Sequence, residues 1–166
     1  MASPLIDSNL TIDVKASPHI LIVEDDAAQQ MLLTDLLQGE GYQTTCVASG
    51  TAALQVIATT HVDLILLDLR LPDTDGFTIC EQIRADKHKQ VPILMLSGCL
   101  DPREALQAFH VGATDYLRKP FDVEQLLIHI RAHLPDKCFD PSWLQDGTAS
   151  QVTILPQPSP DLYTRV

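Results

Sequence analysis

Short apolar runs alternate with amphipathic stretches over residues 18–134 of the chain. Five runs have the length and composition of buried strands, and they span residues 19–23, 42–47, 62–67, 93–96 and 114–117. Between and after these runs, apolar residues recur every three or four positions, as is typical of helices that bury one face. Strands and helices that alternate over short connections form parallel sheets with right-handed crossovers. The pattern therefore predicts an α/β domain of five strand–helix repeats.

Capping residues indicate where several of these helices begin. Asp26 with Gln29 three positions later, and Ser49 further on, predict the starts of the first two helices. The segment 101–104 (Asp-Pro-Arg-Glu) combines an N-cap aspartate, a proline at the first helical position and a capping box. The predicted apolar faces of the first and last helices are Met31, Leu32, Leu33, Leu36 and Leu37, and Val123, Leu126, Leu127, Ile130 and Leu134.

The two ends of the chain differ in composition from this central part. Residues 1–17 mix small and polar side chains without a sustained period, which predicts a flexible N-terminal arm. Residues 135–166 hold five of the eleven prolines, and this favours an extended tail or linker over a helix. The predicted organisation is an arm over 1–17, one domain over 18–134 and a tail over 135–166.

Net charge and composition narrow the classes of partner and compartment. Twenty-two acidic residues against eleven lysines and arginines give a formal net charge of −11. Nucleic acid and anionic lipid are bound by basic side chains, so we expect this chain to bind neither directly. No apolar stretch is long enough to span a bilayer and no signal peptide begins the chain, which predicts a cytoplasmic protein. The four cysteines (46, 80, 99 and 138) lack zinc-site spacing and are predicted to be buried free thiols.

Charged and hydroxyl side chains follow four of the predicted strands. They are Glu24, Asp25 and Asp26 after the first strand, Asp68 after the third, Ser97 after the fourth and Lys119 after the fifth. In doubly wound sheets, ligands bind at the carboxyl ends of the strands, near the point where the strand order reverses. Two carboxylates ~4 Å apart repel by ~4 kcal/mol at an effective dielectric constant near 20, so converging acids need a cation. Oxygen ligands in a wet acidic cleft suit Mg²⁺, and Lys119 adds a positive charge.

Four segments together resemble the receiver domain of bacterial two-component response regulators, closest in motif to the receivers of winged-helix regulators. The segments are 20–26 (ILIVEDD), 64–72 (LILLDLRLP) with Asp75-Gly76, 96–98 (LSG) and 112–121 (GATDYLRKPF). The resemblance covers residues 18–134. It implies a flavodoxin-like (βα)5 fold, which is a doubly wound parallel sheet in the strand order 2-1-3-4-5. It also implies a phosphorylation-dependent signalling switch that acts through the surface of the fourth helix, fifth strand and fifth helix.

The resemblance assigns a role to each matching residue. Asp68 is the phosphoacceptor, which receives its phosphoryl group from a sensor histidine kinase or a phosphotransfer protein. The implied Mg²⁺ ligands are Glu24, Asp25, Asp68 and the backbone carbonyl of Arg70. Ser97 and Lys119 are the implied phosphoryl-binding residues. Ser97 and Tyr116 are the implied switch residues. The Lys119–Pro120 peptide bond is expected to be cis. The protein is expected to be no enzyme, beyond at most a weak autophosphatase activity.

Three other classes of protein share parts of this pattern. A haloacid-dehalogenase-type phosphatase needs a second aspartate two residues after its nucleophile, where this chain has Arg70. A flavodoxin needs a hydroxyl- and glycine-rich phosphate loop after the first strand, where Glu24, Asp25 and Asp26 would repel phosphate. A pseudo-receiver that binds partners without phosphorylation remains as an alternative, although Asp25, Asp68, Ser97 and Lys119 are all present.

The output of the switch is left open by the sequence. The chain is either a receiver that acts alone on a protein partner or a fragment of a longer transcriptional regulator or hybrid kinase. Ile128 lies off the apolar stripe of the last helix and is predicted, with Tyr116, to meet a partner or the chain's own tail after Asp68 is modified. Winged-helix receivers dimerise through charged pairs on this surface, and Asp115 matches one such charge. Thr114, Gln125 and His129 replace others, so we expect a mainly monomeric protein before phosphorylation.

Overall fold

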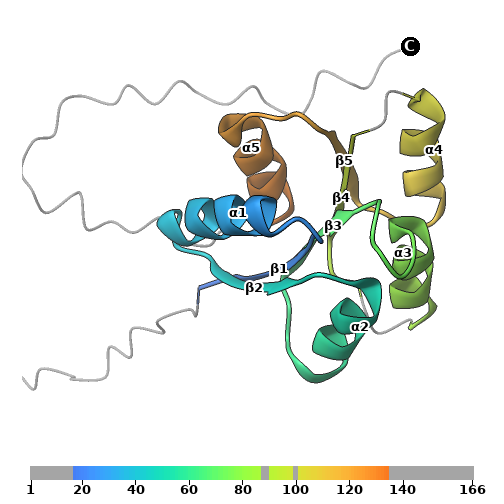
Figure 1. Cartoon of the computed structure of the whole chain (residues 1–166), viewed down its shortest axis with the longest axis horizontal. Helices are drawn as coiled ribbons and strands as arrows, with labels where there is room; N and C mark the ends of the chain where they lie inside the picture. Colours follow the sequence, from blue (N-terminus) through green and yellow to red (C-terminus); the bar gives the residue numbers. More distant parts are fainter. Residues whose placement is uncertain (1–16, 87–89, 99–100, 135–166) are drawn as a thin grey trace, which may run out of the picture.

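Five parallel strands form one sheet in the order β2-β1-β3-β4-β5 in the computed structural model, which describes residues 17–86, 90–98 and 101–134 (Figure 1). The strands are β1 (His19–Val23), β2 (Gln43–Val47), β3 (Leu64–Asp68), β4 (Ile93–Ser97) and β5 (Asp115–Arg118). The helices are α1 (Ala27–Gly39), α2 (Gly50–Thr59), α3 (Gly76–Ala85), α4 (Pro102–His110) and α5 (Val123–His133). The predicted flavodoxin-like fold and its strand order are confirmed.

Helices cover both faces of the sheet, so the core has two layers. Helices α1 and α5 lie on one face, and α2, α3 and α4 lie on the other (Figure 1). The central strands β3 and β4 are buried along their whole length because both of their faces are covered. The side chains of Ile65 and Leu67 therefore join the α2–α3–α4 layer, whereas those of Leu64 and Leu66 join the α1–α5 layer.

Two predicted apolar faces were too wide. In α1, Leu33 and Leu37 are buried, but Met31 and Leu32 are exposed over about two thirds of their surface. Successive helical residues are separated by about 100°, so the run from 31 to 33 cannot share one face. In α5 the stripe is buried at Leu126, Leu127 and Ile130, while Val123, at the first turn, is half exposed.

The predicted caps of α1 and α2 are present, since Asp26 accepts from the backbone N–H of Gln29 and Ser49 accepts from that of Ala52.

Of the four cysteines, Cys80 is a buried free thiol and Cys46 is a half-buried one. The predicted arm over 1–17, apart from its last residue, the tail over 135–166, Cys99 and Cys138 lie outside the described residues. Within the described part of the chain, no helix is long and apolar enough to cross a membrane.

Candidate functional site

The strand register brings the predicted site residues to one edge of the sheet. Val23 of β1 pairs with Leu67 of β3, so the next residues, Glu24 and Asp68, begin the same edge together. Asp68 in turn pairs with Leu96 of β4, which directly precedes Ser97. Ser97 pairs with Arg118 of β5, so Lys119 follows at this edge as well, and its backbone N–H donates to the Ser97 carbonyl at 2.6 Å. Four residues that are far apart in the sequence thus meet at the carboxyl ends of four strands.

Lys119 forms ion pairs with two carboxylates of this edge. Its Nζ donates to Glu24 Oε2 at 2.7 Å and to Asp68 Oδ2. Glu24 is 1% exposed and Asp68 is 8% exposed. With Ser97, they are the buried polar or charged residues of the described chain. Acids with so little access to water require a bonded cation, and Lys119 provides it.

The pKa values in this cluster reflect burial and charge together. Burial raises the pKa of the Glu24 carboxyl above 4.5, and the charge of Asp68 adds to this effect against the opposing pull of Lys119. Burial alone would lower the pKa of the Lys119 ammonium. Its hydrogen bonds to Asp68 and Glu24 overcome burial, and the pKa of Lys119 is raised. The lysine is therefore firmly protonated at neutral pH.

The second oxygen of Asp68 is fixed by the loop that follows β3. Asp68 Oδ1 accepts from the backbone N–H of Arg70 at 2.6 Å. The loop folds back because the N–H of Gly76 donates to the Leu69 carbonyl at 2.9 Å. A Cβ at residue 76 would lie 2.7 Å from the Asp68 carbonyl oxygen, so glycine is required for this close approach of α3. The Asp68 carboxylate is thus held at Oδ1 by the Arg70 backbone and at Oδ2 by Lys119.

These side chains border an open pocket of about 540 Å³. Its charged lining consists of four acids and two bases: Glu24, Asp25, Asp26, Asp68, Arg70 and Lys119. In the described residues, no three His, Cys, Asp or Glu side chains are close enough to enclose a metal ion. Mg²⁺ does not need such a cage, because it is usually held by one or two carboxylates and several waters. The donor set, all oxygen with Asp25 exposed to solvent, fits Mg²⁺ in its chemistry.

Ser97 and Tyr116 do not line this pocket. Ser97 is 2% exposed, and its hydroxyl donates to Glu104 Oε2 of α4 at 2.6 Å. Asp101 caps α4 as predicted, by accepting from the Arg103 backbone N–H at 2.9 Å. Glu104 does not complete the predicted capping box, and its carboxylate bonds to Ser97 instead. Tyr116 is half-buried against the α2–α3–α4 core layer. Sequence reasoning missed the role of Glu104, because its contact crosses a strand–helix connection and matches no local motif.

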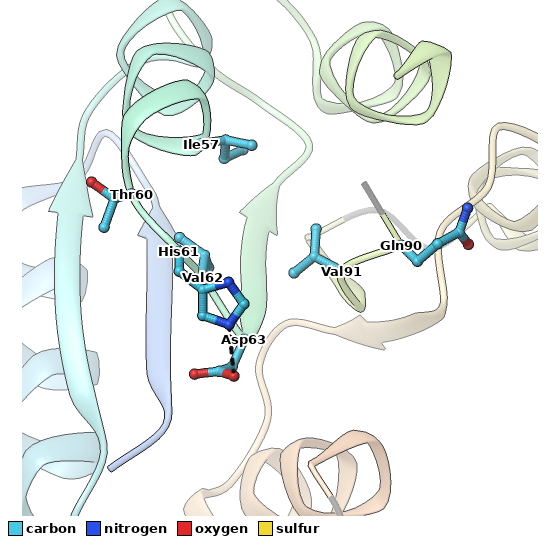
Figure 2. A pocket seen from close by; sticks show the side chains of 7 residues that line it. All are labelled: Ile57, Thr60, His61, Val62, Asp63, Gln90 and Val91. Atoms are coloured by element: carbon cyan, nitrogen blue, oxygen red, sulfur yellow. Dashed lines mark ion pairs between the residues drawn. The ribbon is translucent and has the colours of Figure 1, made fainter. Parts of the chain in front are cut away.

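A second pocket lies at the opposite end of the sheet. It encloses about 380 Å³ beside the starts of β3 and β4, and Figure 2 shows its lining side chains. His61 Nε2 lies 3.4 Å from Asp63 Oδ1 there, and the His61 side chain is 88% exposed. None of the predicted site residues lines this pocket, which therefore belongs to a different surface from the acidic edge.

The predicted signalling surface on α4, β5 and α5 combines exposed apolar side chains with a histidine–aspartate cluster. Leu106, Phe109 and Ile128 are each more than half exposed, as predicted for Ile128. Asp115 Oδ2 accepts from His129 Nδ1 at 2.6 Å and from His133 Nε2 at 2.9 Å.

Two opposing influences act on the Asp115 carboxyl. Burial alone would raise its pKa, but hydrogen bonds from His129, His133 and the Tyr116 backbone hold that pKa below 3.8. The acid that the sequence offered for an intermolecular pair is therefore engaged within the chain.

Comparison with known proteins shows what this arrangement is similar to. The family described as the response regulator receiver domain matches residues 20–131. The chain is 41% identical over 118 residues to the DNA-binding dual master transcriptional regulator RpaA of a Synechocystis strain, covering 70% of this chain and 49% of that protein. It is also 41% identical over 116 residues to the DNA-binding response regulator MtrA of Mycobacterium tuberculosis, covering 70% of this chain and 50% of that protein. The chain thus spans about half the length of these curated relatives.

Solved structures show the same fold. The BeF3-activated N-terminal receiver domain of RstA from Klebsiella pneumoniae superposes with a TM-score of 0.67 at 32% identity, covering 71% of this chain and 99% of that one. The chemotaxis response regulator CheY4 of Vibrio cholerae also gives a TM-score of 0.67, at 30% identity, covering 70% of this chain and 98% of that one. The residues that the family model matches, 20–131, include those of the acidic edge.

Proposed function

Because this chain belongs to the response regulator receiver family, we propose that it is a switch in which Asp68 accepts a phosphoryl group from a histidine kinase or phosphotransfer protein. The observation that supports this most directly is the Asp68 carboxylate, which opens into the acidic pocket and is held by Lys119 and the Arg70 backbone. A phosphorylation-independent pseudo-receiver requires no phosphoryl acceptor at Asp68, so direct phosphorylation distinguishes the two.

The proposed reaction is a phosphoryl transfer between two side chains. A carboxylate oxygen of Asp68 attacks the phosphorus of a phosphohistidine, the P–O bond forms, the P–N bond breaks, and the imidazole takes a proton from solvent. Lys119 is already at the carboxylate, so its charge is in place for the phosphoryl oxygens. Glu24, Asp25, Asp68 and the Arg70 carbonyl are the proposed Mg²⁺ ligands. When bound there, Mg²⁺ supplies further positive charge for the transferred group.

The test of the proposed function is direct phosphorylation. Incubation of the full chain with phosphoramidate and Mg²⁺ is expected to add the mass of one phosphoryl group, lost again on treatment with hydroxylamine, as is typical of an acyl phosphate. A chain whose mass does not change under these conditions would support the pseudo-receiver instead.

We propose that the protein works in the cytoplasm and binds no nucleic acid or membrane through this chain, in keeping with its net charge of −11.

Mg²⁺ is expected to stabilise the protein, and Asp25→Asn is expected to remove most of this effect. A ligand that binds only the folded state adds RT ln(1 + [L]/Kd) to its stability, which is about 2.7 kcal/mol at a hundredfold excess over Kd. Thermal unfolding with and without millimolar Mg²⁺ measures this shift. Asp35→Asn, an exposed position on α1, is the control and should keep the full shift. An unchanged melting temperature in the wild type would contradict the metal site.

The acyl phosphate is expected to persist for longer than seconds without a phosphatase. In the family, the side chains two positions after the phosphoaspartate and after the switch hydroxyl flank the attacking water. Here these are Arg70, which is exposed, and Cys99, which lies outside the described residues. Neither is suited to orienting water, so any autophosphatase activity is expected to be weak. Decay of the phosphorylated mass after removal of phosphoramidate gives the rate, and a half-life of seconds would contradict this expectation.

Ile128 is expected to contribute to partner or self-association only after Asp68 is modified. Before modification we propose a mainly monomeric protein, since Asp115 is engaged by His129 and His133. Sedimentation of the wild type and Ile128→Asp, with and without beryllofluoride and Mg²⁺, tests this. Association that needs beryllofluoride and is lost in Ile128→Asp would support the proposal. A stable dimer of the unmodified wild type that Ile128→Asp leaves intact would refute it.

A further inference from the structure

The hydroxyl of Ser97 has a partner that competes with the phosphoryl group. Its single proton is donated to Glu104 Oε2 at 2.6 Å, a length typical of a charge-assisted bond. A hydroxyl has one proton to donate, so Ser97 cannot donate to Glu104 and to a phosphoryl oxygen at once. Under the proposed function, the bond to Glu104 must break before Ser97 can donate to a phosphoryl group on Asp68.

Glu104 also connects Ser97 to a helix that is weakly anchored by packing. Of the nine residues of α4, Ala108 alone is buried, while Leu106 and Phe109 are 72% and 51% exposed. Glu104 lies in the first turn of this helix, and its bond to Ser97 ties that turn to the end of β4. An element with few buried apolar contacts moves at low cost once such a bond is released.

We propose that Glu104 is a positioning residue that holds Ser97 away from the phosphoryl site and so sets the resting population of the switch. This inference rests on the proposed function. The phosphoryl group, which carries about −1.5 to −2 charges, offers Ser97 a stronger acceptor than one carboxylate oxygen. Transfer of the hydroxyl bond to it frees the first turn of α4. Glu104 thus links the charge on Asp68 to the position of α4.

The affinity for beryllofluoride, a phosphoryl mimic, measures this competition. Fluorine NMR titration of the full chain with beryllofluoride and Mg²⁺ is expected to show about fivefold tighter binding in Glu104→Gln, because a charge-assisted hydrogen bond is roughly twice as strong as a neutral one. Glu104→Asp keeps the charge but shortens the reach, and is expected to bind more tightly as well. Glu124→Gln removes an exposed first-turn acid of α5 instead, and should bind like the wild type.

A double variant separates the hydrogen bond from a general charge effect. In a Ser97→Ala background, Glu104→Gln is expected to change the beryllofluoride affinity by less than about twofold, since the bond it weakens is already absent. An equal gain with and without Ser97 would overturn the inference and assign the effect to charge alone. So would binding by Glu104→Gln and Glu104→Asp that equals the wild type. A wild type that binds no beryllofluoride would instead overturn the proposed function, and the inference with it.

Discussion

Asp68→Asn is expected to abolish phosphorylation by phosphoramidate while leaving the fold intact. The asparagine amide has the shape of the carboxylate but no anionic oxygen to attack phosphorus. Its oxygen can still accept from the Arg70 backbone, and Lys119 keeps its ion pair with Glu24. Loss of one bond to Lys119 is offset by relief of the repulsion between Asp68 and Glu24. We therefore expect the free energy of unfolding to change by less than about 1 kcal/mol.

Intact-mass measurement after incubation with phosphoramidate and Mg²⁺ gives the phosphorylated fraction, and chemical denaturation gives the stability. Asp35→Asn makes the same chemical change at an exposed position of α1 and should be phosphorylated like the wild type. Uptake of a phosphoryl group by Asp68→Asn at the wild-type level would show that another residue is the acceptor.

Lys119→Met is expected to lower the free energy of unfolding at neutral pH by about 3 kcal/mol, because it leaves buried carboxylates without their cation. Glu24 and Asp68 both bond to Lys119, and their side chains are 2% and 11% exposed. Methionine retains the length and the apolar stem of lysine, so the loss reports on charge more than on packing. Chemical denaturation of the two proteins gives the difference.

The loss in Lys119→Met is expected to shrink as the pH falls. Burial raises the pKa of Glu24 even in the wild type, and removal of Lys119 raises it further. A carboxyl whose pKa is raised on folding destabilises the folded state above that pKa, and this cost disappears as it takes up a proton below it. In the wild type, the raised pKa of Lys119 keeps its ammonium charged over the acidic and neutral range, so the change in its contribution at low pH comes from protonation of the carboxylates.

Two controls complete the experiment. Arg118→Met removes an exposed base from the neighbouring residue and should change the stability by less than about 0.5 kcal/mol. The double variant Lys119→Met with Glu24→Gln should recover part of the loss, since one of the two buried carboxylates that Lys119 neutralises is gone. A Lys119→Met protein as stable as the wild type, or one whose loss grows as the pH falls, would show that the carboxylates do not depend on this lysine.

The sequence by itself determined the fold and the composition of the acidic edge. Strand–helix alternation and caps at Asp26 and Ser49 are local features, which depend on backbone propensity and periodicity within a few residues. The position of Asp68 at a strand end, and the cis Lys119–Pro120 bond, followed from motifs that are each contiguous in the chain. Glu24, Asp68 and Lys119 could be expected together because parallel strands end at the same edge.

Only the tertiary structure decided which partner each side chain takes. Lys119 bonds to Glu24 as well as Asp68, Ser97 to Glu104, and Asp115 to two histidines of α5. The exposure of Met31, Leu32 and Val123 could not be predicted, because apolar periodicity indicates a helix but not the width of its buried face. The hydrogen-bonded pairs join side chains that are seven to ninety-five residues apart and that compete for the same donors. Such competition is settled by distance and burial in the folded chain, which no local pattern encodes.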